Sequence, residues 1–321
     1  ENETHQGGVT VKQSVSHYMM PGDTEKSVRQ VVEELGLDGI ENLIYGEEPA
    51  AHPAKSLTIG CHLAYFPVWM NFYLGKKEWY EKDFPTPADR RRVFGGETVE
   101  AWLTKIRNNI HAALAEEPEY LVWHVADCRN LDIWTRQFQY TNREILEKTA
   151  EIYHQVEKEI PSSVQVLFEN IFWPGLYQLD PAEVEYFFTL LGRDNVGIML
   201  DTGHLMNTNL DLQTEADGAD YVCQVVNRLG TMKSLVKGMH LSCSLSSAYQ
   251  KATWGKIPEI VNPSVIGNHI ISIDQHRPFQ TDAARRIVDT VEPEYLTHEL
   301  FGRTYGVPME EVRIQLMAMQ L

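Results

Sequence analysis

The sequence predicts a single (β/α)8 barrel with long loops over the C-terminal ends of its strands. Eight short hydrophobic runs alternate with helical patterns, and most of the runs end in histidines or carboxylates. Such a barrel needs about 250 residues and carries its active site at the C-terminal ends of its strands. The 321 residues of this chain therefore fit one barrel with long loops. We expect one domain over 1–321, with long insertions at 64–97 and 241–273.

Each predicted strand is short, rich in β-branched or aromatic residues, and bounded by turn-forming or polar residues. Strands that alternate with helices form a parallel sheet, and eight of them imply that the sheet closes. The predicted strands cover residues 9–15, 39–45, 57–62, 120–125, 164–169, 196–200, 238–241 and 295–300.

Apolar residues recur at helical spacing between these strands. Residues 27–35 predict the first helix, and the apolar series from Val99 to Ala113 predicts a later one. Thr141 and Glu144 form a capping-box pattern before another apolar helical face. In the next helix Asp180-Pro181 marks the start and Gly192 the end, which is the usual order of capping residues.

The segment from Ala64 to Phe94 has no regular period and contains many aromatic residues. It is much longer than the 2–6 residues typical of a connection between strand and helix. We interpret it as a loop that covers the site.

The formal net charge of −17 argues against binding to long duplex DNA, because such binding depends on neutralising phosphates with Lys and Arg. No apolar stretch reaches the roughly 18 residues of a membrane helix. The N-terminus begins Glu1-Asn2-Glu3, without Met, and lacks a signal-peptide pattern. The four cysteines have no CxxC spacing, which favours reduced thiols in the cytoplasm. No feature of the sequence indicates an oligomeric state.

The ends of the predicted strands carry the residues with chemical potential. Asp201-Thr202-Gly203-His204 ends the sixth strand, and the glycine permits a turn that brings the histidine back toward the barrel mouth. Carboxylates and imidazoles from the fifth to eighth strands suit a divalent cation such as Mn²⁺, Mg²⁺ or Zn²⁺. The candidate metal ligands are His62, His124, Glu169, Asp201, His204, His240, Asp274, His276 and Glu299.

On these nine residues the chain resembles the endonuclease IV and xylose-isomerase-like family of TIM barrels, from the third strand to the eighth. In the endonuclease branch, nine ligands of these types, in this order, hold three zinc ions. The resemblance implies that His62 and His124 hold one ion and that Glu169 bridges it to a second ion. Asp201, His240 and Glu299 would complete the second site, and His204, Asp274 and His276 would form the third.

Two features depart from the endonuclease pattern. The 33-residue connection 241–273 is longer than in the endonucleases, and Val125-Ala126-Asp127-Cys128 lacks their Pro-Gly. Family members that act on sugars use only the Glu, Asp, His, Glu quartet and one ion, with the two glutamates as acid and base. Glu169 and Glu299 are therefore the candidate catalytic residues.

Four further residues are candidates for contact with a small-molecule substrate. Arg277 follows His276 and can clamp a phosphate or carboxylate. Trp173 forms an apolar wall beyond Glu169, Tyr65 follows His62 in the aromatic segment, and His17 ends the first strand. For His17 the alternative is an ordinary polar residue at a strand end.

Three functions remain open. The preferred hypothesis is a metal-dependent phosphoester hydrolase with up to three Zn²⁺ ions and a small phosphorylated substrate, because a one-ion enzyme does not need His62, His124, Asp274 and His276. The alternative is a sugar or polyol isomerase or epimerase with one Mn²⁺ or Mg²⁺ ion. A non-catalytic metal-binding protein is the third.

Overall fold

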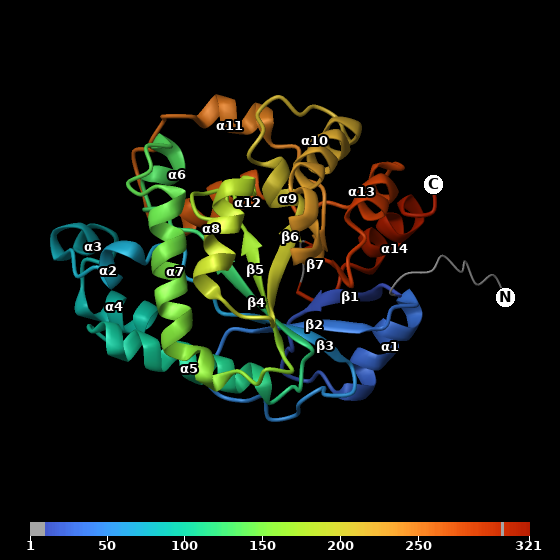
Figure 1. Ribbon diagram of the computed structural model, residues 1–321, viewed down its shortest axis with the longest axis horizontal. Helices are drawn as coiled ribbons and strands as arrows, with labels where there is room; N and C mark the ends of the chain where they lie inside the picture. Colours follow the sequence, from blue (N-terminus) through green and yellow to red (C-terminus); the bar gives the residue numbers. More distant parts are fainter. Residues whose placement is uncertain (1–9, 303–304) are drawn as a thin grey trace.

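The computed structural model describes residues 10–302 and 305–321, and it shows a closed barrel of eight parallel strands in sequential order. Helices surround the barrel on the outside (Figure 1). The predicted (β/α)8 fold is confirmed. The strands are β1 (Lys12–His17), β2 (Gly39–Ile44), β3 (Thr58–Leu63), β4 (Tyr120–Val125), β5 (Gln165–Asn170), β6 (Val196–Asp201), β7 (Val236–Leu241) and β8 (Tyr295–His298).

The predicted strand boundaries differ from the observed ones by a few residues. Val9, the predicted start of the first strand, lies outside the described residues, and β1 begins at Lys12. β7 begins at Val236, two residues before the prediction. Lys237 interrupts the apolar run there, and its Nζ donates to Gln165 Oε1 at 2.7 Å. β8 ends at His298, so Glu299 follows the last strand directly.

The main helices of the barrel have the predicted caps. The Thr141 side chain accepts from the Glu144 amide at the start of α7 (Asn142–Val156), and Asp180 and Gly192 cap the two ends of α8 (Pro181–Leu191). The larger surrounding helices are α1 (Glu25–Leu35), α5 (Val99–Leu114), α7 (Asn142–Val156), α8 (Pro181–Leu191), α10 (Glu215–Arg228), α13 (Ala283–Val291) and α14 (Met309–Ala318). Shorter pieces are α6 (Asp132–Thr135), α9 (Thr202–Met206), and the 3-10 turns η1 (Glu157–Glu159) and η2 (Gly230–Leu235).

The first insertion is helical, and the interpretation of residues 64–94 as a loop over the site is wrong for most of its length. It forms α2 (Met70–Tyr73), α3 (Lys77–Asp83) and α4 (Pro87–Phe94), which lie at the side of the barrel (Figure 1). Its buried aromatic residues are Trp69, Phe72, Phe84 and Phe94, which pack in one cluster with Trp102 of α5. The Phe72 and Phe94 rings stack with centroids 3.9 Å apart. The many aromatic residues of this segment thus indicate a packed layer, because aromatic rings are stabilised by packing against one another. Only Tyr65, Phe66 and Pro67 reach the cavity described below.

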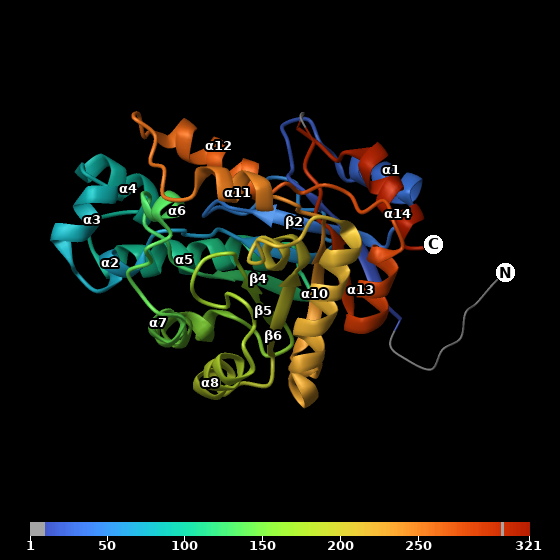
Figure 2. The same cartoon turned by 90° about the horizontal axis from the view of Figure 1, so that it is seen from above.

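The second insertion also contains helices, α11 (Ser247–Thr253) and α12 (Pro263–Ile273). Figure 2 shows both on the opposite side of the strands from α7 and α8. His269 anchors α12, because its Nδ1 is 2.7 Å from Tyr249 Oη and its ring stacks on Trp134 at 4.7 Å. None of the helices formed by the described residues is long and apolar enough to cross a membrane.

Below the site, side chains fill the barrel interior. Tyr120, Val122, Leu167 and Met199 are fully buried there. Gly60, next to Tyr120 in the strand register, makes room for this tyrosine. A Cβ atom on Gly60 would lie 2.1 Å from the Tyr120 ring.

We predict that Gly60→Ala destabilises the protein by about 1–3 kcal/mol, the usual cost of overpacking a well-packed core. Gly267→Ala in α12 is the matched control, because no heavy atom lies within 4 Å of its added Cβ. It should leave the stability unchanged or raise it by up to about 1 kcal/mol, since Ala is the better helix former. Urea denaturation measures both, and equal stabilities of the two variants would contradict the packing described.

Candidate metal centre

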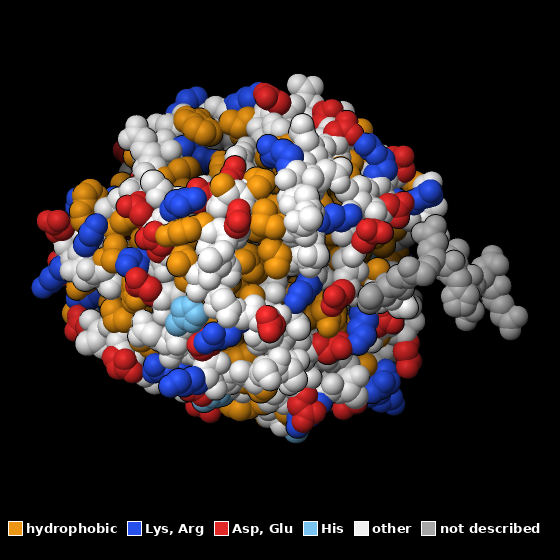
Figure 3. Space-filling view, in the orientation of Figure 1, with side chains coloured by type: hydrophobic (Ala, Val, Ile, Leu, Met, Phe, Trp, Pro, Cys, Tyr) orange, Lys and Arg blue, Asp and Glu red, His pale blue; other side chains and the backbone are white. Residues whose placement is uncertain are grey.

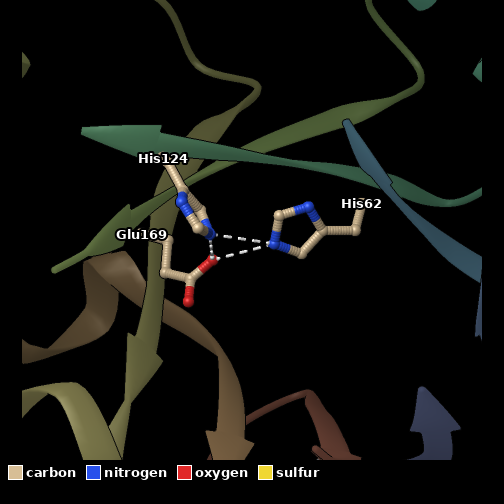
Figure 4. A group of neighbouring side chains, drawn as sticks. All are labelled: His62, His124 and Glu169. Atoms are coloured by element: carbon tan, nitrogen blue, oxygen red, sulfur yellow. Dashed lines mark hydrogen bonds and ion pairs between the residues drawn. The ribbon is translucent and has the colours of Figure 1, made fainter. Parts of the chain in front are cut away.

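The first group of candidate ligands joins three neighbouring strands. His62 from β3, His124 from β4 and Glu169 from β5 point toward one another (Figure 4). Parallel pairing places His124 directly beside Glu169. Glu169 Oε2 lies 3.0 Å from His124 Nε2 and 3.2 Å from His62 Nε2, and the two imidazole nitrogens are 3.1 Å apart. The three atoms thus surround a common point.

The second group consists of Glu169, Asp201, His240 and Glu299, and all four are buried. The strand register pairs Asp201 with His240. His240 Nδ1 lies 2.6 Å from Glu299 Oε2, 3.2 Å from Glu169 Oε1 and 3.7 Å from Asp201 Oδ2. Glu169 therefore belongs to both groups and directs one oxygen to each.

The third group lies beside the second and contains His204, Asp274 and His276. Asp274 Oδ2 is 3.0 Å from His204 Nε2 and 3.4 Å from His276 Nε2. His276 Nε2 is also 3.1 Å from Glu299 Oε1, which joins this group to the second. His276 has a φ of 48°, a conformation rare for residues other than glycine. Such strained conformations cluster at functional sites.

The Asp201–His204 motif forms the turn that the sequence predicted. Asp201 Oδ1 accepts from the His204 amide at 2.7 Å and caps the short helix α9. A Cβ on Gly203 would lie 2.7 Å from Ser242 Oγ, so a larger residue there would displace that side chain. The other oxygen of Asp201, Oδ2, is buried and has no hydrogen-bond partner.

The donor set of the three groups fits divalent cations. Asp201 Oδ2 and Asp274 Oδ1 are buried oxygens without a hydrogen-bond partner. No Lys or Arg is among the described residues that line the cavity above them. Buried charges without partners are costly, and they are found paired or bound to metals. Oxygen and imidazole ligands suit zinc, manganese and other borderline or hard divalent ions.

The pKa values of these groups show how strongly the site favours positive charge. Burial alone would lower the pKa of His204, but Asp201 and Asp274 raise it well above its ordinary value. Burial is likewise outweighed at His276, where Asp274 and Glu299 raise the pKa to about 9. Burial also raises the pKa of Asp201 to about 6. In the metal-free protein the imidazoles of His204 and His276 are therefore protonated near neutral pH.

A cavity of about 210 Å³ lies above the three groups, and its walls are largely aromatic. Aromatic rings lie beside the four outer histidines, which are His62, His124, His204 and His276. Tyr65 stacks on His124 at 4.5 Å. The nearest Phe or Tyr rings to the other three are Phe301 to His276 at 4.7 Å, Phe172 to His204 at 5.5 Å and Tyr45 to His62 at 5.9 Å. Trp173 also lines the cavity.

Two of the candidate substrate-binding residues do not reach this cavity. Arg277 is exposed, and its backbone pairs with Cys243. Arg277 is not among the residues that line the cavity, whereas His276 is. His17 is buried outside the barrel interior, with Nε2 3.9 Å from Asp23 Oδ2, because Ser14 and Ser16 take the inward positions of β1. His298 also points outward and contacts Gln13 and Gln315.

Sequence reasoning missed Glu41 and Tyr45, both of which contact the site. Glu41 on β2 is fully buried, and both of its oxygens lie within 3.0 Å of His240 Nε2. Tyr45 lines the cavity directly after β2. The available signal was a single acidic residue within the otherwise buried strand Gly39–Ile44, where a charge requires a partner.

The fold and the three ligand groups define the class: a (β/α)8 barrel with the donor set of a metal centre. Among solved structures the chain is similar to endonuclease IV from Thermus thermophilus, at 14% identity over 96% of this chain and 97% of that chain, with a TM-score of 0.56. It is similar to an L-ribulose 3-epimerase, at 12% identity over 95% and 94%, with a TM-score of 0.55. A D-allulose 3-epimerase from Methylomonas sp. matches at 11% identity over 97% and 98%, with a TM-score of 0.53.

These likenesses agree with the family resemblance seen in the sequence, and at such identities they establish the fold. No protein-family model and no curated protein sequence matches the chain.

The raised pKa values predict opposite effects of pH on metal binding and on the stability of the metal-free protein. Metal ligation needs neutral imidazole, so binding should release protons and its affinity should rise between pH 6.5 and about 9. In the metal-free protein, the folded pKa of His276 lies above its unfolded value of 6.5. Its stabilising contribution is therefore fully present below pH 6.5 and is lost as the pH rises through about 9.

Calorimetry in buffers of different ionisation enthalpy would count the released protons. Urea denaturation of chelator-treated protein between pH 6.5 and about 9 would give the stability. A metal affinity that is independent of pH would contradict the assignment of these histidines as ligands.

Proposed function

We propose that the protein is a divalent-metal-dependent enzyme, a phosphoester hydrolase that acts on a small phosphorylated substrate. The observation that carries this proposal is the position of Glu169. One of its oxygens faces His62 and His124, and the other faces His240. A carboxylate between two sets of ligands is suited to bridge two ions, whereas an enzyme that uses one ion has no need of the outer histidines.

In this proposal His62, His124 and Glu169 hold one ion, and Glu169, Asp201, His240 and Glu299 hold a second. His204, Asp274 and His276 hold a third, with Zn²⁺ as the preferred metal because imidazole and carboxylate ligands suit it. Bound ions of this kind lower the pKa of water toward about 7 and polarise a phosphoryl oxygen. The aromatic rings beside the outer histidines line the cavity above the candidate ligands.

The cavity supports a small substrate with one anionic group. Its volume of about 210 Å³ suits a small molecule. Its described lining residues include no Lys or Arg that could bind a second anionic group. Trp173 Nε1 is buried without a partner and can donate one hydrogen bond to a ligand. The body of the substrate would otherwise contact the rings of Tyr45, Tyr65 and Phe172.

The surface supports a small substrate over long duplex DNA. On the face shown in Figure 3, the basic side chains are scattered among acidic ones. The formal charge of −17 repels a polyanion. All four cysteines are free thiols, which supports a reducing compartment such as the cytoplasm.

A second candidate is a sugar or polyol isomerase or epimerase. The quartet of Glu169, Asp201, His240 and Glu299 is buried and sufficient for one Mn²⁺ or Mg²⁺ ion, and a cavity without cationic side chains among its described lining residues also suits an uncharged substrate. Glu169 and Glu299 would exchange a proton with substrate carbon. A metal-binding protein without catalytic activity is the third possibility, and it predicts turnover in neither assay.

The metal content of the protein and of two variants separates the first two candidates. His62→Ala and His276→Ala each remove a ligand that only the hydrolase needs. If the protein is the hydrolase, it should contain nearly three Zn²⁺ per chain, and each variant should lose metal and at least about a hundredfold in turnover of a small phosphoester, a barrier change of about 2.7 kcal/mol.

For the isomerase, metal content should stay at one ion per chain in all three proteins, and the variants should change mainly KM for a ketose. Elemental analysis with p-nitrophenyl phosphate and ketose assays provides the measurements. Unchanged metal content in both variants would reject the hydrolase.

Glu169→Gln should abolish activity in either mechanism while the protein stays folded, because the change removes a charge and little volume. Circular dichroism and thermal unfolding would verify the fold. Turnover above about a tenth of the wild-type value, a barrier change below roughly 1.4 kcal/mol, would contradict both mechanisms.

A further inference from the structure

We propose that Glu41 is a positioning residue that decides which ring nitrogen of His240 binds metal. The inference rests on the metal centre of the proposed function but not on the reaction that the centre performs. It assigns a role to a buried carboxylate that lies outside the three ligand groups.

The contacts of His240 divide its two ring nitrogens between different tasks. Nε2 lies 2.8 Å from Glu41 Oε1 and 3.0 Å from Glu41 Oε2, on the side of β2. Nδ1 faces the carboxylates of Glu169 and Glu299 at 3.2 and 2.6 Å. The two nitrogens point in different directions, so one imidazole joins Glu41 to the ligand quartet.

Other buried side chains hold Glu41 in this position. Tyr120 Oη donates to Glu41 Oε2 at 2.7 Å, and Thr297 Oγ1 donates to the same oxygen at 3.0 Å. Ser14 Oγ lies 2.9 Å from Thr297 Oγ1 and continues the network to β1. All four residues are buried, so water does not compete for these bonds.

This geometry fixes the tautomer of His240. An ionised carboxylate accepts hydrogen bonds and cannot donate them, so Nε2 must carry the proton that lies between it and Glu41. In neutral imidazole the lone pair is then on Nδ1, which faces the metal ligands. A carboxylate behind a metal-binding histidine also raises the basicity of the ligand, and loss of such partners typically costs roughly 10–100-fold in metal affinity.

A purely structural role for Glu41 makes a different prediction. Glu116 provides the comparison, because it is a buried glutamate away from the site that accepts from the Ala54 amide at 2.8 Å. If Glu41 only fills and bonds the interior, then Glu41→Gln and Glu116→Gln should both lower stability and leave metal affinity alone. If Glu41 positions His240, only Glu41→Gln should weaken metal binding.

The test measures Zn²⁺ affinity by competition with a chromogenic chelator, using the full chain and four proteins: wild type, Glu41→Gln, Tyr120→Phe and Glu116→Gln. We expect the affinity of the tightest site or sites that include His240 to fall roughly 10–100-fold in Glu41→Gln. Tyr120→Phe keeps the carboxylate and removes one of its donors, so its loss should be smaller. Glu116→Gln should bind Zn²⁺ as the wild type does.

Long-range ¹⁵N–¹H NMR of the zinc-loaded wild type gives a second, independent measurement that does not depend on folding of a variant. His240 should appear with a protonated Nε2 and a metal-bound Nδ1. Coordination through Nε2, or a Glu41→Gln affinity within about threefold of wild type while the variant stays folded, would overturn the inference and leave the proposed function standing. A wild-type protein that binds no Zn²⁺ or Mn²⁺ would overturn both.

Discussion

The structure of the site depends on one electrostatic constraint, which is the burial of several carboxylates around a few imidazoles, with no Lys or Arg among the described residues that line the cavity beside them. Glu41, Glu169, Asp201 and Glu299 converge on His240 within a space from which water is largely excluded. Such a collection of negative charge is stable only if cations or protons neutralise it. The raised pKa values of His204 and His240 and the donor types both express this requirement.

Closure of the barrel makes this convergence possible. The parallel register places His124 beside Glu169 and Asp201 beside His240 at the C-terminal ends of their strands. Tyr120 and the apolar residues around it fill the barrel interior below the candidate ligands. Tyr120 also donates to Glu41, so the same side chain supports the packing and the polar network above it. The packing of the interior and the polar network around His240 are therefore linked through one residue.

The two insertions shape the environment of the ligands in different ways. The first packs its aromatic residues onto α5 and sends only Tyr65, Phe66 and Pro67 toward the cavity. The second places α12 so that Asp274 and His276 follow directly at its end. A long connection between His240 and Asp274 is thus compatible with the third ligand group, because its extra residues form α11 and α12 and return to the barrel mouth.

The sequence by itself determined the fold class, the eight strands and the convergence of the candidate ligands at the strand ends, because polar side chains there interrupt apolar runs. Asp274 and His276 follow α12, and the family resemblance indicated them. The sequence did not determine which side chains contact one another between elements that are far apart in the chain. Tertiary packing decided three features of the structure: the burial of aromatic rings in the first insertion, the positions of His17 and Arg277 away from the cavity, and the contact of Glu41 with His240. A residue's neighbours across a barrel depend on register and alternation in several strands at once, and no local pattern records them.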